Sequence, residues 1–270
     1  MGFLQPILED FEKDRQRVDH LLNLIKLFRE FGASAPPKCG EKEIEWSAAT
    51  ALLEASKTRR TDLPLLAGAL QMYLAGRFEF FIRQLVEAVA DEISASCGAF
   101  SDLPDVVRAE LKIKTLEVAQ NPRRFGYDEL SAEALLSDLA GNLAGSVSIR
   151  SVVLTITESN MKDRVLADVL RRVGITDFWK EVGKQNAMKI LLGTASDGET
   201  TAEAIGKLNA LMDDRNQIAH PTGNTVFPDP DQVLSVSEYL GALAETTADV
   251  AEIHAAKFKR SRAAALSGGN

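Results

Sequence analysis

Residues 72–92, MYLAGRFEFFIRQLVEAVADE, decide the fold that we expect for this chain. Apolar residues fall on more than one side of a helix around residues 78–82, so this part of the helix has no continuous polar face. A helix that is apolar on all sides is buried inside a protein. With its flanks, the segment is expected to run from about residue 65 to 96 as the central helix of an all-α protein.

Helical periodicity continues on both sides of this central segment. Residues 4–31 place apolar side chains three and four residues apart and stop before a loop rich in Pro, Gly and Ser. Residues 200–220 and 230–256 carry two further long helical patterns, and Thr200 with Glu203 is expected to cap the first of them. Shorter helices are expected over residues 44–58, 104–119, 127–142 and 162–173, with helical pieces over 177–192.

These patterns predict a single all-α domain over residues 1–256. Its core helices are expected at about residues 65–96, 200–220 and 230–256. Segment 148–157, SIRSVVLTIT, is rich in β-branched residues and fits either an extended strand or a short buried helix. Residues 257–270 are expected to form a mobile basic tail, which is either the frayed end of the last helix or a segment that contacts phosphates.

Composition excludes several classes of protein. The chain has 270 residues, of which 45% are hydrophobic, so it can bury a sizeable core. No run approaches the 18 to 20 uninterrupted apolar residues, roughly, that a membrane span needs, and the N-terminus is too acidic for a signal peptide. We therefore expect a cytoplasmic protein without a membrane partner, in which Cys39 and Cys97 are reduced thiols.

The formal net charge of −8 argues against a protein that coats nucleic acid, because such binding depends on Lys and Arg neutralising phosphates. An acidic protein can still hold one or two phosphates in a small cleft that a few arginines line. The candidates for such a cleft are Arg77, Arg83, Arg123, Arg124 and Arg215.

The helix that ends in LNALMDDRNQIAHP, residues 208–221, places a permanent cation within an apolar stripe. Arg215 lies at its centre, since the neighbouring apolar residues fall within about 60° of it at 100° per residue. These residues are Leu208, Leu211, Met212, Ile218 and Ala219. A guanidinium is not buried without a partner, so the stripe must open here onto a carboxylate, a phosphate or a polar cleft.

Asn216 and His220 are four residues apart and share one flank of the same helix. Pro221 disfavours helical geometry at His220, which places the imidazole at the helix C-terminus, where the dipole favours its cationic form. Simple structural roles stay open at this point. Arg215 can pair with a carboxylate of a neighbouring helix, and His220 can be an ordinary residue of a last turn.

Two stretches of the chain resemble a known superfamily. RNQIAH, residues 215–220, resembles the Arg-(four to six residues)-His motif of HEPN domains, in which a polar residue such as Asn216 often follows the arginine. Residues 72–92 are similar to the long central helix of the RiboL-PSP-HEPN branch, with an aromatic-Glu-aromatic cluster at residues 78–81. The resemblance implies an elaborated HEPN-like bundle with additional N-terminal and middle helices.

The resemblance also implies a metal-independent endoribonuclease, a toxin or an anti-phage effector, with Arg215, His220 and Asn216 as its catalytic residues. Such cleavage needs a base, an acid and a cation at the phosphate, and histidine and arginine fit these roles. The motif supplies one histidine, His220, for each chain, whereas the reaction needs both an acid and a base. The resemblance therefore predicts a homodimer with a composite site. The expected partners are RNA and an antitoxin or another defence protein, with no metal or other cofactor, since Asp213 and Asp214 diverge on the helix.

Three residues of the central helix are candidates for supporting the site or binding substrate: Glu79, Arg77 and Arg83. Glu79 either forms an ion pair with Arg83, four residues on, or orients Arg215 or His220 from the neighbouring helix. His20 and His254 are expected to be structural. The rival to a ribonuclease is a non-catalytic helical module for dimerisation or RNA binding, and a nucleotide-binding adaptor is disfavoured because no Gly-rich phosphate loop is present.

Overall fold

The computed structural model describes residues 2–33, 47–58 and 62–267. These residues form ten α-helices and no strand, which confirms the predicted all-α class. The α-helices are α1 (Gln5–Ala33), α2 (Ser47–Thr58), α3 (Leu63–Ala95), α4 (Asp105–Gln120), α5 (Glu129–Leu143), α6 (Asp163–Arg171), α7 (Phe178–Lys184), α8 (Asn186–Leu192), α9 (Asp197–Ala219) and α10 (Pro230–Ser267). Three short 3-10 helices are η2 (Phe100–Asp102), η3 (Pro122–Phe125) and η4 (Ser151–Thr155).

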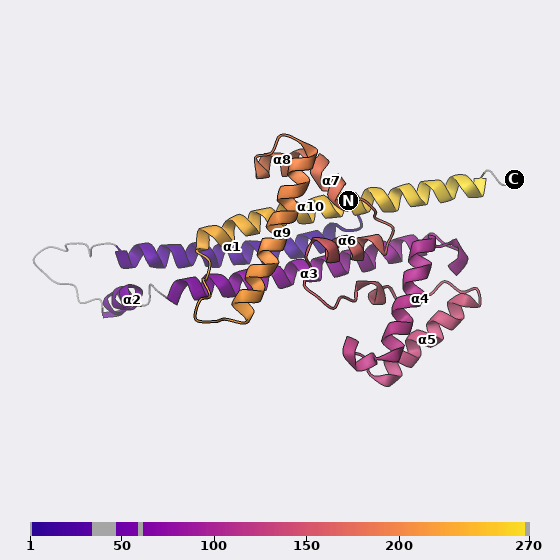
Figure 1. The fold of residues 1–270 in the computed structure, drawn as a ribbon, viewed down its shortest axis with the longest axis horizontal. Helices are drawn as coiled ribbons and strands as arrows, with labels where there is room; N and C mark the ends of the chain where they lie inside the picture. The colour runs from indigo at the N-terminus through magenta and orange to yellow at the C-terminus, as the bar shows by residue number, and fades with distance from the viewer. Residues whose placement is uncertain (1, 34–46, 59–61, 268–270) are drawn as a thin grey trace, which may run out of the picture.

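Helix α3 is the central helix, as the sequence predicts. Helices α1 and α10 run alongside it, α9 crosses these long helices, and α4 with α5 forms a separate hairpin near the end of α3 (Figure 1). Phe11 of α1 packs against Phe78 and Phe81 of α3, with ring centroids 6.0 and 5.3 Å apart. By length and composition alone α3 could cross a membrane, but its packing against α1, α9 and α10 makes it the core helix of this bundle.

Helix α9 begins earlier than the sequence analysis places it. Ser196 accepts a hydrogen bond from the backbone N–H of Glu199, whose carboxylate accepts one from the N–H of Ser196, so these two residues form the capping box. The predicted box of Thr200 and Glu203 is wrong. Thr200 is instead fully buried, and its hydroxyl donates to the carbonyl of Ser196.

Segment 148–157 contains a short buried helix and no strand. Residues 151–155 form η4, where Val153 and Leu154 are fully buried and the helix packs against α3. Of the two alternatives that the β-branched pattern leaves open, the structure has the helical one. Residues 156–162 then lead from η4 into α6.

The basic segment from residue 257 continues the last helix, which is one of the two alternatives that the sequence leaves open. Helix α10 continues without a break through Ser267, so no change in structure marks residue 257. Lys259 forms an ion pair with Glu92 at the end of α3, and Arg262 forms one with Asp102 of η2 at 2.5 Å. These tertiary contacts bind Lys259 and Arg262 to the bundle.

Candidate active site

Arg215 lies within the apolar stripe of α9, between the buried Met212 and Ile218, as the sequence predicts. Leu208, Leu211, Met212 and Ile218 are buried on this face, whereas Arg215 is half-buried. The stripe opens at Arg215 onto the segment between η4 and α6. The sequence analysis expects polar surroundings for the guanidinium of Arg215, and this segment provides them.

Asn160, in that segment, is the hydrogen-bond partner of Arg215. Its side-chain oxygen accepts a hydrogen bond from Nη1 of Arg215 at 2.5 Å, and its amide nitrogen donates to the side-chain oxygen of Asn216 at 2.5 Å. Among the described residues, no carboxylate forms an ion pair with Arg215. A guanidinium carries five N–H donors, so most of its donors stay available to a ligand.

Three contacts hold the segment around Asn160 in place. The backbone N–H of Met161 donates to Oε1 of Glu79 at 3.2 Å, and that of Asp163 donates to the side-chain oxygen of Asn209 at 3.0 Å. Lys162 forms an ion pair with Asp213 at 2.5 Å. Because Met161 itself is buried, the segment is fixed against both α3 and α9 by polar and apolar contacts.

Glu79 therefore supports the site through the backbone of Met161 and does not contact Arg215 or His220. The alternative prediction, an ion pair between Glu79 and Arg83, is wrong as well. Nη2 of Arg83 instead donates to the hydroxyl of Thr157 at 3.2 Å, which places Arg83 at the start of the same segment.

Arg77 does not join this group. Its Nε lies 2.5 Å from a carboxylate oxygen of Asp14 on α1, and its guanidinium lies over the ring of Phe80, 4.7 Å from the centroid. Arg77 thus connects α3 with α1 and is committed to a carboxylate. The structure places it outside the candidate site.

His220 caps the C-terminus of α9, as predicted. Its backbone N–H donates to the carbonyl of Asn216 at 3.0 Å, and its φ of −127° and ψ of 66° take the chain out of the helix. The imidazole is exposed and makes no hydrogen bond to the residues that the structure describes. It is therefore free to contact a substrate.

The neighbouring aspartates of α9 point in different directions. Asp213 pairs with Lys162, whereas Asp214 lies on the side of the buried Gln71 of α3. Partial burial raises the pKa of Asp214, the charge of Asp213 adds to this, and the neighbouring Gln71 side chain opposes it. Within the described ranges, no group of three or more His, Cys, Asp or Glu side chains could hold a metal ion.

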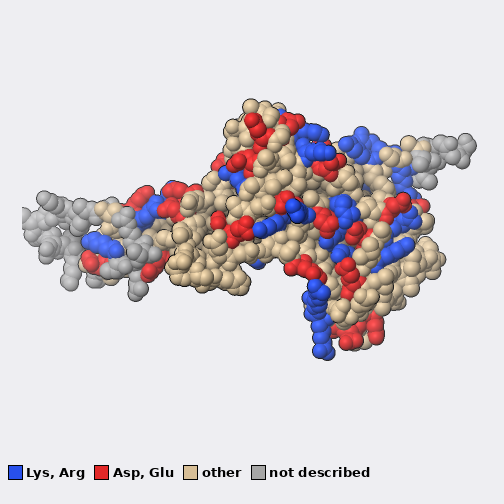
Figure 2. Space-filling view, in the orientation of Figure 1, with Lys and Arg blue, Asp and Glu red and all other residues tan. Residues whose placement is uncertain are grey.

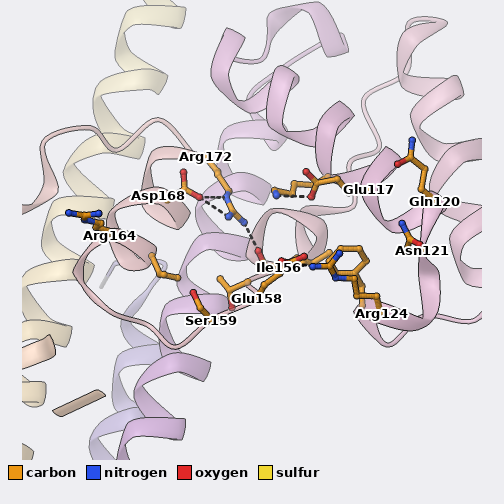
Figure 3. A pocket seen from close by; sticks show the side chains of 14 residues that line it. Glu117, Gln120, Asn121, Arg124, Ile156, Glu158, Ser159, Arg164, Asp168 and Arg172 are labelled. Carbon is orange, nitrogen blue, oxygen red and sulfur yellow. Dashed lines mark hydrogen bonds and ion pairs between the residues drawn. The ribbon is translucent and has the colours of Figure 1, made fainter. Parts of the chain in front are cut away.

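A pocket of about 590 Å³ lies beside the same segment, between the end of α4 with η3 and the start of α6 (Figure 3). Residues 156–159 line it on one side, and Arg164 and Arg124 line it from α6 and η3. Elsewhere on the face shown in Figure 2, basic and acidic side chains are interspersed. No broad basic surface is visible on that face.

Sequence reasoning missed Asn160 and Met161. Neither belongs to a motif, and an asparagine in a polar connection is an ordinary turn residue. Only the folding of the 156–162 segment against α9 gives Asn160 its role, so no pattern in the sequence could have identified it. Arg215 was identifiable because a cation in an apolar stripe is exceptional.

An all-helical bundle with a long central helix, beside a helix that carries Arg and His five residues apart at its C-terminus, is a HEPN-type domain. The chain belongs to the RiboL-PSP-HEPN family, whose model matches residues 41–252. Domains of this class are often ribonucleases, so membership of the family points to a role related to RNA. No curated protein and no solved structure matches it.

Proposed function

We propose that this protein is a metal-independent endoribonuclease. The observation that carries the proposal is the state of Arg215: half-buried, held in place by the uncharged amide of Asn160, and without an acidic partner among the described residues. A structural arginine at such a position would pair with a carboxylate, as Arg77 does with Asp14. The charge of Arg215 is instead available to a phosphate.

In the proposed reaction the 2′-hydroxyl of RNA attacks the adjacent phosphorus, and the bond from phosphorus to the 5′-oxygen breaks. A base removes the proton of the hydroxyl, and an acid donates a proton to the leaving oxygen, so the products are a cyclic phosphate and a 5′-hydroxyl. His220 serves one of these steps, Arg215 stabilises the charge on the phosphate oxygens, and the free amide N–H groups of Asn216 bind substrate.

A second copy of the chain would supply the second histidine. Four large apolar side chains of α3 stay 44 to 54% exposed, although most of the apolar face of this helix is buried: Leu65, Leu66, Tyr73 and Phe80. Figure 2 shows an area almost free of charged groups over the start of α3 and the connection that follows α9. Large apolar side chains that stay exposed on a central helix favour a homodimer, and a homodimer would supply the composite cleft.

Cleavage of a mixed pool of single-stranded RNA in EDTA tests the proposal. We expect cyclic phosphate ends, a loss of about 10² to 10³ in kcat for Arg215→Ala and about 10² to 10⁴ for His220→Ala. Lys207→Ala is the matched control, because Lys207 is an exposed cation of the same helix. Cleavage that chelator abolishes, or that survives in both variants, contradicts the proposal.

The rival function is a non-catalytic module for dimerisation or RNA binding. In that case Arg215→Ala would lower the stability of the protein, and its expression would leave growth unaffected. The proposed toxin or anti-phage role predicts that expression in the cytoplasm slows growth, that His220→Ala abolishes this effect, and that an antitoxin or another defence protein restrains it.

A further inference from the structure

The pocket between α4 and α6 borders directly on the candidate site. Ser159 lines the pocket, and the next residue, Asn160, holds Arg215. Consecutive Cα atoms are about 3.8 Å apart, so the rim of the pocket and the partner of Arg215 are neighbours. A strand whose phosphate lies at Arg215 therefore reaches the pocket with an adjacent nucleotide.

The charged groups of the pocket leave one cation uncommitted. Three of its basic side chains are paired: Lys114 with Glu117, Arg124 with Glu158, and Arg172 with Asp168. Arg172 is buried and also donates to the carbonyls of Leu154 and Ile156. Arg164 is exposed on the α6 side and makes no ion pair or hydrogen bond to the residues that the structure describes. A single guanidinium without an acidic partner can bind one phosphate group, whereas a ligand with many phosphates would need several such cations.

The opposite side of the pocket offers neutral groups. Gln120 and Asn121 carry amide side chains that make no hydrogen bond to the described part of the chain, and Figure 3 shows them on the α4 side, across from Arg164. Phe125 adds a half-buried aromatic ring. Amides that read a base edge and a ring on which a base stacks are the means by which proteins bind unpaired RNA bases.

We propose that this pocket binds one unstacked nucleotide of the RNA, adjacent to the scissile phosphate, and thereby sets the base preference of cleavage. The base contacts Gln120, Asn121 and Phe125, and the phosphate of that nucleotide contacts Arg164. A volume of about 590 Å³ is ample for one nucleotide. The inference rests on the proposed ribonuclease function.

Sequencing of cut sites in a randomised RNA pool tests the pocket. The wild-type protein is expected to prefer one base next to the cut, and Gln120→Ala to flatten this preference. Arg164→Gln should raise KM about tenfold and leave kcat within about twofold, since it removes one charge-assisted contact outside the reacting atoms. The control is Arg260→Gln, because Arg260 is exposed and, within the described part of the chain, bonds only to the carbonyl of Ala256 in its own helix.

Binding of a fluorescent 2′-O-methyl RNA octamer pool separates this inference from the ribonuclease proposal, because such RNA lacks the attacking hydroxyl. A roughly tenfold weaker affinity in Arg164→Gln, with Arg260→Gln unchanged, supports the pocket even if the wild-type protein cuts no RNA. Equal affinity in Arg164→Gln and wild type overturns the pocket, whatever the outcome of the cleavage assay. A cut-site preference that Gln120→Ala leaves intact overturns it too.

Discussion

At the scale of single residues, the amide of Asn160 is the feature that distinguishes this site. It bonds with Arg215 and Asn216 at the same time, so it fixes the positions of two candidate catalytic side chains without neutralising the guanidinium. A carboxylate at position 160 would fix Arg215 equally well but would compete with a phosphate.

Two replacements of Asn160 distinguish the effect of the charge of Arg215 from the effect of its position. Asn160→Asp should lower kcat/KM about tenfold or more, because it pairs with Arg215 and loses the donor to Asn216. Asn160→Ala should lower kcat by loosening Arg215. The matched control is Asn186→Asp, since Asn186 is exposed at the start of α8. Wild-type activity in Asn160→Asp would show that the charge of Arg215 is not used.

His254 makes the stability of the fold depend on pH. Its Nε2 donates to the carbonyl of Val173 at 3.0 Å, and burial lowers the pKa of the imidazole below its ordinary value of 6.5. Below about pH 6.5 the unfolded chain therefore binds a proton that the folded protein does not, and the free energy of unfolding falls as the pH falls through the lowered pKa.

Urea unfolding between pH 7.5 and 5 measures this effect. We expect His254→Gln, which keeps an N–H donor for Val173, to show a smaller loss of stability over this range than the wild-type protein. His20→Gln is the control, since it removes an imidazole that is exposed on α1. An unaltered pH dependence in His254→Gln would contradict the assignment.

At the scale of elements, the 156–162 segment connects the central helix with the site. Glu79 on α3 accepts from Met161, whose neighbour Asn160 holds Arg215. A substitution on α3 should therefore reach α9 through a single backbone hydrogen bond.

Glu79→Ala leaves the N–H of Met161 without an acceptor, which should cost about 1 to 2 kcal/mol of the free energy of unfolding. It should also speed amide hydrogen exchange over residues 158–163 and lower kcat. Glu79→Gln retains a side-chain oxygen that can accept from Met161, so its amide exchange and its kcat should be close to those of the wild-type protein. If exchange in this segment is the same in Glu79→Ala and wild type, the coupling is absent.

Most helices could be predicted because local features determine them. Helix α4 ends before Asn121 and Pro122, where proline disfavours the helix, and the buried face of α3 repeats with helical spacing. The ion pairs that join the last turns of α10 to the distant Glu92 and Asp102 could not be predicted, since they depend on tertiary packing.

The candidate site was predictable only in part, for the same reason. Arg215, Asn216 and His220 share one helix, so helical geometry alone places them near each other. The partners of Glu79, Arg77 and Arg83 depend on which segments pack against α3. Spacing along one helix gives no information about that packing.

At the scale of the whole molecule, the proposed function requires two copies. In the proposed dimer the exposed apolar residues of α3 would be buried between the two copies, and the two imidazoles would lie in one composite cleft. Activity is then expected to depend on protein concentration, since only the dimer has a complete site.

Leu66→Lys tests this surface, because Leu66 is 53% exposed and a lysine there costs the folded monomer little. We expect sedimentation velocity to show a weaker dimer and RNA cleavage to fall in parallel, while the thermal midpoint of the monomer is unchanged. Leu130→Lys is the control, at a residue that is 78% exposed on α5. A monomeric wild-type protein that cleaves RNA at full rate would remove the need for a composite site.

The uncharged partner of Arg215 has a consequence for the cell that makes this protein. Among the residues that the structure describes, no salt bridge must break before a phosphate reaches the guanidinium, so no acidic group of the site itself would keep the proposed nuclease idle. Restraint would have to come from outside the site, through a molecule that covers it, through low abundance, or through dilution of the two copies.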